Sequence, residues 1–197
     1  MGRRAGVTAE QTRSTLLSAA ADIFAAKGYD GASISDICTA ASLTSGALYT
    51  HYSSKAELFV AVLEAHGQRQ FQDLVSGAGD VASFLATAGA AYGRLQTDSS
   101  LMIEAIVASK RHPEVAQLVA SWLDADEDLL AASIREAQQS GALAEGLEPE
   151  AISRLATMIS LGSILISELE VRNLDSEAWA NLIDQLVDIV RVTRPGE

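Results

Sequence analysis

The chain of 197 residues is long enough for one large domain or two smaller ones, and too short for a multi-domain machine. Hydrophobic residues make up 48% of it and only three residues are proline, so the chain can bury a core and is not a disordered polymer. Its net charge of −12 argues, for the chain taken whole, against a nucleic-acid partner, because phosphate binding depends on Lys and Arg. The longest apolar runs, residues 81–93 and 155–167, are shorter than a membrane span of roughly 18 residues, so we expect no membrane partner.

The charge is not spread evenly along the chain. Residues 1–55 hold five basic and four acidic residues, a net charge of +1, whereas residues 56–197 hold nine basic and 22 acidic residues, a net charge of −13. Only the first part can approach a polyanion without strong repulsion. We therefore expect two domains, residues 1–55 and residues 56–197, with different partners.

Several kinds of chemistry have no residues to perform them. The single Cys38 cannot form an intramolecular disulfide or a zinc cluster, and we interpret it as a buried core residue rather than a redox sensor. His66 and His112 are too isolated to predict a metal site. Because no G-x-S-x-G or HExxH element and no Gly-rich phosphate loop is present, we expect no enzyme activity and no cofactor. The N-terminal arginines are not followed by an apolar segment, so we expect a cytoplasmic protein without a secretory signal.

Apolar residues recur at intervals of three and four along almost the whole chain, which predicts helices throughout. Thr8 and Gln11 are spaced as a capping box for the first helix, which we expect to end at Gly28. Ser33 is placed to cap a short second helix, and Thr44 is placed to cap a third.

Further helices follow these three. Ser54 is placed to cap a fourth helix. Beyond it we expect helices over residues 81–95, 101–111 and 113–139, and two more after residue 149. The sequence therefore predicts an all-α fold of about nine helices.

The second and third helices, separated by a short turn and supported by the first, match the helix-turn-helix arrangement, which lays its second helix in the major groove of DNA. The third helix and its flanks separate into two sides. The apolar side, expected to pack inward, consists of Leu43, Leu48 and Tyr52. The polar side carries hydroxyls, an imidazole and a bare backbone at Thr44, Ser45, Gly46, Tyr49 and His51. Lys55, at the start of the fourth helix, adds a cation that suits a phosphate oxygen.

The run SISDICTAASLTSGALYTHYSSKAELF, residues 33–59, resembles the DNA-binding signature of the TetR family of transcriptional regulators. The resemblance is carried by an ordered set of residues, namely Phe24, Gly28, Ser33, Ile37, Ala41, Leu43, Gly46, Leu48, Tyr49, His51, Tyr52, Lys55, Glu57 and Leu58. It implies an N-terminal three-helix helix-turn-helix DNA-binding domain in residues 1–55 and a C-terminal helical ligand-binding and dimerisation domain in residues 56–197.

The resemblance also implies a mode of action. The protein is expected to be a homodimeric repressor that binds a pseudo-palindromic operator in double-stranded DNA and releases it when a small-molecule effector binds. An activator or a co-repressor-dependent regulator is the alternative within the family. A helical protein-interaction module is the alternative outside the family, and it would leave the polar side of the third helix unexplained.

The resemblance implies DNA contacts at Ser33, Ser35, Thr44, Ser45, Gly46, Tyr49, His51 and Lys55. Ser45, Gly46 and Tyr49 would lie nearest the base edges, although the Tyr49 hydroxyl could bond a phosphate instead. Gly46 could permit close approach of DNA or serve helix geometry alone. The predicted recognition helix holds no Arg, Lys, Asn or Gln, the side chains that read bases in bidentate fashion. Specificity is therefore expected from DNA shape, from thymine methyl groups, or from an arm formed by Arg3 and Arg4.

The last two helices are apolar on two adjacent stripes each. A chain of this size covers one stripe per helix most simply with its own residues and the second with a twofold copy, which predicts a four-helix dimer interface. The alternative is that helices of the same chain cover both stripes. The residues expected at the interface are Ile159, Gly162, Leu165, Ile166, Trp179, Ile183, Leu186 and Val190.

The effector site is less well indicated. A cavity is expected among the fourth to eighth helices, and it is expected to take a neutral or cationic lipophile rather than a highly anionic ligand. Its candidate lining residues are Leu63, His66, Phe84, Tyr92, Met102, Ile106, Trp122, Leu123 and Met158. Each of these residues could equally belong to the ordinary core.

Overall fold

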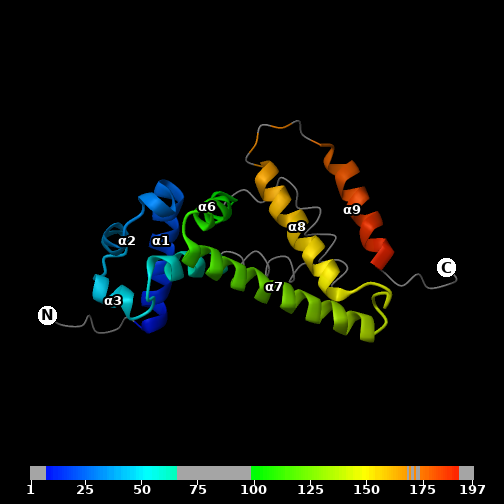
Figure 1. Ribbon diagram of the computed structural model, residues 1–197, viewed down its shortest axis with the longest axis horizontal. Helices are drawn as coiled ribbons and strands as arrows, with labels where there is room; N and C mark the ends of the chain where they lie inside the picture. The colour runs from blue at the N-terminus through cyan, green and yellow to red at the C-terminus, as the bar shows by residue number, and fades with distance from the viewer. Residues whose placement is uncertain (1–7, 66–98, 168, 170, 172–173, 191–197) are drawn as a thin grey trace. The chain divides into compact units, whose positions relative to one another are not determined.

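The computed structural model describes residues 8–65, 99–167, 169, 171 and 174–190 (Figure 1). Its elements in this part of the chain are helices, which confirms the predicted all-α class. They are α1 (Ala9–Gly31), α2 (Ile34–Ala40), α3 (Ser45–Tyr49), a helix over residues 55–65, α6 (Ser99–Ser109), α7 (Pro113–Gln139), α8 (Pro149–Ser167) and α9 (Ser176–Val190). The helix predicted over residues 81–95 lies outside the described residues.

The chain divides by its packing into two compact units. The first comprises Met1–Gly67 and Ser100–Trp122, and the second comprises Gln68–Ser99 and Leu123–Glu197. The corner between α6 and α7 therefore packs with the N-terminal helices. This division is based on packing and does not test the boundary after residue 55 that was expected from function, which stays a prediction.

Helix α1 begins with the predicted capping box. The Gln11 amide donates to Thr8 Oγ1 at 3.1 Å, and the Thr8 amide donates to Gln11 Oε1 at 2.9 Å. The helix does not end at Gly28, as the sequence suggested, but is interrupted there and continues to Gly31. Gly28 has φ +67° and ψ 175°, a conformation open essentially to glycine alone. A Cβ atom on Gly28 would also lie 3.1 Å from an oxygen of Glu104.

Helices α2 and α3 begin at the predicted caps. The Asp36 amide donates to Ser33 Oγ at 3.1 Å, and the Ala47 amide donates to Thr44 Oγ1 at 3.2 Å. Each bond satisfies an amide that has no partner within its own helix. The turn between the helices contains Ser42 at φ +54°, and it is closed by the Leu43 amide donating to the Cys38 carbonyl at 2.9 Å.

The helix over residues 55–65 is also capped as predicted, since the Glu57 amide donates to Ser54 Oγ at 3.0 Å. The carboxylate of Glu57 reaches one residue further back and accepts from the amide and the hydroxyl of Ser53, at 2.7 and 2.5 Å. These bonds hold the pKa of Glu57 below its ordinary value. The turn after α3 is therefore tied to the helix that follows it.

The core of the first unit joins α1, α2, α3 and the helix over residues 55–65. Leu16, Ile37 and Leu48 are fully buried. The rings of Phe24 and Phe59 meet edge to face, with their centroids 4.7 Å apart. Cys38 is buried on α2, as predicted for a core residue.

The second unit has a core of its own. Its buried side chains are Ile134, Leu143, Ile183 and Val187, with Leu130, Ala137, Ile152 and Trp179 packed around them. Helices α7 and α8 meet closely at Ser153, which is fully buried and donates its hydroxyl to the Glu127 carbonyl at 2.9 Å.

Helix α8 is unusually apolar for its degree of exposure. Among the described residues, the stretch Pro149–Ile166 is the one helix long and apolar enough to cross a membrane, and 17% of it is buried. A helix that packs against another protein surface passes the same test of length and composition. The exposure of α8 therefore identifies a surface that lacks a partner within the described chain.

Candidate nucleic-acid interface

Helix α3 presents a polar surface and buries an apolar one. Leu48 is fully buried and Tyr52 is 4% exposed, so both anchor the helix to the first unit. Tyr49 is 54% exposed, and the exposed positions around it are Thr44, Ser45 and Gly46. The separation of polar and apolar sides expected from the sequence is therefore present in the structure. It leaves the outer surface of α3 free to enter a groove.

Gly46 has no internal reason to be glycine. It lies in the regular helix α3, and a Cβ atom added to it would meet nothing nearer than Thr44 Oγ1, at 3.9 Å. Helix geometry and protein packing would both accept alanine there. The space beside Gly46 is open to an outside molecule, and the predicted close approach of DNA there stays a prediction.

The other predicted DNA-contacting residues on the helix-turn-helix are accessible. Ser33 and Ser35 are exposed on α2, and the Ser33 hydroxyl accepts the capping bond from Asp36. His51 is half-buried, and its ring lies 6.4 Å from that of Tyr52. Arg3 and Arg4 lie outside the described residues.

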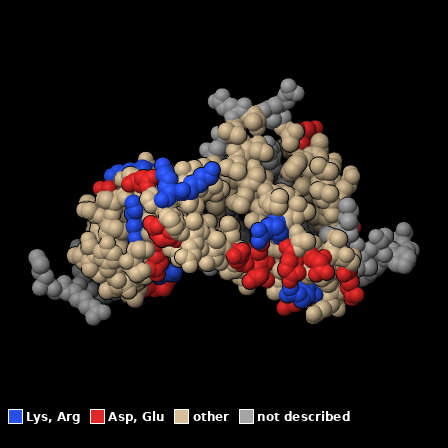
Figure 2. All heavy atoms as spheres, in the orientation of Figure 1, with Lys and Arg blue, Asp and Glu red and all other residues tan. Residues whose placement is uncertain are grey.

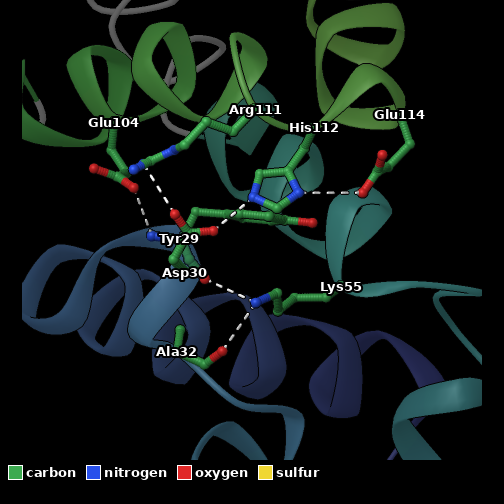
Figure 3. A network of polar contacts seen from close by, with 8 residues as sticks. All are labelled: Tyr29, Asp30, Ala32, Lys55, Glu104, Arg111, His112 and Glu114. Atoms are coloured by element: carbon green, nitrogen blue, oxygen red, sulfur yellow. Dashed lines mark hydrogen bonds and ion pairs between the residues drawn. The ribbon is translucent and has the colours of Figure 1, made fainter.

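Lys55 has a role that sequence reasoning missed (Figure 3). Its ammonium donates to the carbonyls of Tyr29 and Ala32, at 2.8 and 3.1 Å, and lies 4.3 Å from the centre of the Tyr29 ring. Carbonyls at the C-terminal end of a helix lack partners and carry partial negative charge, so a lysine is well suited to cap them. Two of the three ammonium hydrogens are used in this way. The predicted phosphate contact of Lys55 stays a prediction, and it depends on the third hydrogen.

Comparisons with known proteins agree with this geometry. The model of the family described as bacterial regulatory proteins, tetR family, matches residues 16–62. The HTH-type transcriptional regulator UidR of Escherichia coli K12 is 27% identical over 177 residues, which cover 86% of this chain and 87% of the relative. The chain is similar to regulators of the TetR family, and its residues 16–62 match the DNA-binding domain of that family. It is a helix-turn-helix transcriptional regulator, and regulators of this family are not enzymes.

Two further comparisons bear on the two parts of the chain. The HTH-type transcriptional activator FasR of Mycolicibacterium smegmatis is 41% identical over 68 residues, which cover 34% of this chain and 29% of the relative. The solved structure of Salmonella enterica GusR superposes with a TM-score of 0.67 and 21% identity, covering 89% of this chain and 93% of that chain. The likeness in fold thus extends well beyond the DNA-binding helices.

Most of the predicted dimer residues are accessible, and one is not. Leu165, Ile166 and Leu186 are 43%, 40% and 43% exposed. Ile183 is 3% exposed and packs in the core of its own unit, so it has almost no surface to offer a partner. The side chain of Val190 lies outside the described ones.

A shallow hollow of about 200 Å³ brings α8 and α9 together at this surface. Its lining residues are Met158, Ile159, Gly162, Ser163, Ile166, Leu174 and Trp179. Four of them are predicted dimer residues, and Met158 is a predicted ligand contact. Met158 is 62% exposed, so it lies on the same surface as the predicted interface.

The remaining predicted ligand residues are only partly described. Leu63 is buried in the first unit, and Met102 and Ile106 on α6 are half-buried. Trp122 and Leu123 on α7 are half-buried as well. His66, Phe84 and Tyr92 lie outside the described residues. The effector cavity therefore stays a prediction.

The two units also differ in surface charge. Figure 2 shows acidic side chains gathered over the second unit, where Asp124, Glu127, Asp128 and Glu150 line a hollow with Arg154. No group of three or more potential metal ligands occurs among the described residues. The acidic surface faces solvent and would repel a polyanion, whereas α3 carries no acidic residue.

Proposed function

We propose that the chain is a repressor that binds a pseudo-palindromic operator as a homodimer and is released by a small lipophilic effector. The observation that carries the proposal is the outer surface of α3. Thr44, Ser45 and Tyr49 are exposed there, around a glycine whose missing side chain serves no internal purpose. Hydroxyls and a bare backbone can reach base edges and phosphates without a bidentate side chain.

The expected readout of sequence follows from this composition. Ser45, Gly46 and Tyr49 are proposed to lie nearest the bases, while Ser33, Thr44 and His51 hold the phosphate backbone. Ser35 is able to reach either. With no bidentate side chain on α3, preference is expected from thymine methyl groups and from groove shape.

Dimerisation is proposed through the α8–α9 apolar surface, which we define as the exposed apolar side chains Leu155, Met158, Leu165 and Ile166 of α8 with Leu182 and Leu186 of α9. Counted from Leu155, the other three on α8 follow after three, ten and eleven residues, which places all four on one side of the helix. A contiguous exposed surface of this kind is typical of a protein interface. Two copies would place two recognition helices about 34–36 Å apart, one turn of DNA.

Effector release is proposed to act through helix orientation. An effector that prefers another tilt of the helix over residues 55–65 would change the separation of the two recognition helices, and the dimer would no longer match its half-sites. The neutral or cationic character of the effector is expected from the acidic balance of residues 56–197. The protein is proposed to work in the cytoplasm, where it meets DNA.

The first experiment is a selection of DNA by the purified full-length chain, from random sequence and from the DNA flanking its own gene. Selected DNA is then titrated by fluorescence anisotropy over a salt series with unrelated DNA as competitor. Competitor-resistant binding to a palindromic site with a steep salt dependence is expected. Equal affinity for selected and unrelated DNA would contradict the proposal.

Activation is a second candidate, because the chain is 41% identical to FasR, named as an activator, over 68 residues. The sign of regulation depends on where the operator lies relative to the promoter, and the protein sequence does not contain that information. A reporter gene driven by the native promoter separates the two. Expression should rise when the regulator gene is deleted if the protein represses, and fall if it activates.

A further inference from the structure

The segment from the interruption of α1 to its C-cap, residues 28–32, is held from two sides; we call it the α1–α2 joint. On one side Lys55 bonds the carbonyls of Tyr29 and Ala32. The joint ends directly before Ser33, the residue that caps α2. Whatever fixes the joint therefore fixes where α2 starts, and α3 follows α2 through a closed turn.

On the other side of the joint lies Glu104 of α6 (Figure 3). Its Oε1 accepts a hydrogen bond from the Tyr29 amide at 2.8 Å, across 75 residues of sequence. The same carboxylate occupies the space that a side chain on Gly28 would fill. The unusual backbone at Gly28 thus turns the Tyr29 amide outward, and a charged acceptor meets it there.

A second contact reaches the joint from the corner between α6 and α7. Asp30 bonds Arg111 Nη2 at 2.9 Å with one oxygen and His112 Nε2 at 2.6 Å with the other. The His112 ring also meets Tyr29 edge to face, with the ring centres 4.9 Å apart. The pKa of Asp30 lies below its ordinary value, because of the bond from His112 first and the charge of Arg111 next.

From these contacts we infer that Glu104, Arg111 and His112 are positioning residues for operator binding, because they hold the α1–α2 joint and through it set the placement of α2 and α3. They touch no DNA in this account. The inference rests on the proposed function, since operator affinity is its readout. It adds a second set of contacts that position the DNA-binding helices. These contacts come from α6 and from the corner between α6 and α7, not from the helix over residues 55–65.

The contact between His112 and Asp30 is the one that we expect to depend on pH. A neutral ring has one N–H, which Nε2 gives to Asp30, and its bare Nδ1 then faces Glu114 Oε1 at 3.6 Å. A protonated ring donates to both carboxylates, and histidine is the side chain that changes charge between pH 5 and 8. The other charged or titratable groups around the joint are Arg111, Lys55, Glu104 and Tyr29. Side chains of these four types ordinarily titrate outside the range from pH 6 to pH 8.

The test compares variants of the full chain on the DNA selected by the wild-type protein. Glu104→Ala removes the acceptor of the Tyr29 amide and is expected to weaken operator binding about tenfold, with the salt slope unchanged because no phosphate contact is lost. Glu104→Gln keeps an oxygen acceptor and is expected to recover most of the affinity. Arg111→Ala is expected to weaken binding about threefold, and Lys110→Ala, at the same corner, is the matched control with no loss beyond its effect on charge.

Thermal unfolding of each variant is followed in parallel, and binding is measured well below the unfolding temperature so that the folded fraction stays near one. Arg111 has an exposed side chain, so its alanine variant is expected to fold even if Glu104→Ala does not. A variant with wild-type thermal stability and weakened operator binding has lost positioning and not folding.

The pH profile supplies the readout that a general structural role would not move. Wild-type affinity is expected to rise between pH 8 and pH 6, and His112→Gln is expected to lose about threefold of that rise. His51→Gln, close to the proposed DNA surface, removes any rise that comes from a histidine beside phosphate and is the control. Wild-type operator affinity in both Glu104→Ala and Arg111→Ala, or an unchanged pH profile in His112→Gln, overturns the inference. Failure of the wild-type protein to select any DNA overturns the proposed function instead.

Discussion

The two units of the molecule differ in how completely each covers its own apolar surface. In the first unit, Leu16, Phe24, Ile37, Leu48 and Phe59 are buried to 1% exposure or less. In the second, α8 and α9 leave large apolar side chains 40–62% exposed. Among the described residues, the first unit thus covers its own core, whereas the second leaves apolar surface that the proposed dimer would bury. This difference separates the proposed DNA-binding surface, which lies on the well-packed unit, from the proposed dimer surface, which lies on the other.

The largest expected effect tests whether the second unit forms the proposed dimer interface. Leu165→Glu or Leu186→Glu places a charge on the α8–α9 apolar surface and is expected to give monomers whose operator affinity falls about 100-fold, because two half-sites are no longer bound together. Light scattering measures the mass and anisotropy measures the affinity. Leu147→Glu, equally exposed at 42% but in the loop before α8, is the control and should leave a dimer. Dimers of normal affinity in the two test variants would move the interface elsewhere.

The next effect tests the stability of the first unit. Gly28→Ala is expected to destabilise the protein by about 1–3 kcal/mol, because φ +67° strains any other residue and the added Cβ approaches Glu104. Gly31→Ala is the matched control, because its Cβ would meet only Lys27 Cβ, at an ordinary 3.4 Å. Denaturant unfolding measures both. Equal stability of the two variants would show that the interruption of α1 accepts a side chain at residue 28.

A smaller effect asks whether Lys55 serves the protein, the DNA or both. Lys55→Ala is expected to lower the salt slope of operator binding by about one, as the loss of one phosphate contact requires. Its capping bonds to Tyr29 and Ala32 are lost as well, which lowers stability without changing the slope. Anisotropy over a salt series separates these two consequences. Weaker binding with an unchanged slope would leave Lys55 only its capping role.

Acid should weaken the first unit through its paired carboxylates. The pKa of Asp36 is lowered first by its bond from Lys27 and then by Ser33, that of Asp30 first by His112, and that of Glu57 by Ser53. A pKa that is lower in the folded state stabilises the fold above the unfolded-state pKa, about 4, and this stability is lost as pH falls through the folded-state pKa. The unfolding temperature should therefore drop below about pH 4. Asp36→Asn should make that drop smaller. If the unfolding temperature of Asp36→Asn depends on pH as that of the wild-type protein does, the Asp36 carboxylate does not contribute to the acid sensitivity.

The smallest effect concerns Tyr52. Its hydroxyl is buried without a hydrogen bond of ordinary geometry among the described residues, with the Arg13 side chain as the nearest charged group, so the ring contributes most to anchoring α3. Tyr52→Phe is expected to leave the free energy of unfolding unchanged within about 0.5 kcal/mol, since it removes no hydrogen bond of ordinary geometry. Leu48→Ala, in the same anchor, should cost about 2–5 kcal/mol and is the contrast. A large loss in Tyr52→Phe would reveal a partner for the hydroxyl.

Short-range features of the fold could be predicted from the sequence because their causes lie within four residues. Thr8, Ser33, Thr44 and Ser54 all cap helices as expected, since a cap joins a side chain to an amide three residues away. The polar side of α3 could be predicted for the same reason. The resemblance of residues 33–59 to a family signature supports the predicted caps and the predicted polar side of α3.

Long-range contacts could not be predicted in this way. Gly28 was expected to end α1, but the Glu104 carboxylate that meets the Tyr29 amide comes from 75 residues away. Lys55 was expected to face phosphate, and its two carbonyl partners lie 26 and 23 residues upstream. Ile183 was expected at the dimer interface because a helical stripe shows which residues are apolar but not which neighbour covers them. Periodicity carries no information on that choice.

The buried hydroxyl of Ser153 limits how the second unit can move. At this position α8 touches α7 through a side chain with no exposed surface, and the Ser153–Glu127 bond spans 2.9 Å. Sliding α8 by one turn along its neighbour would bring Ala156 or Thr157 to the contact. Ala156 has no hydroxyl for the Glu127 carbonyl, and Thr157 adds a methyl group to a fully enclosed position. Rotation about the contact keeps the bond. A rotation of α8 about Ser153 would therefore preserve this contact, and it would displace the C-terminal end of α8 more than its N-terminal end.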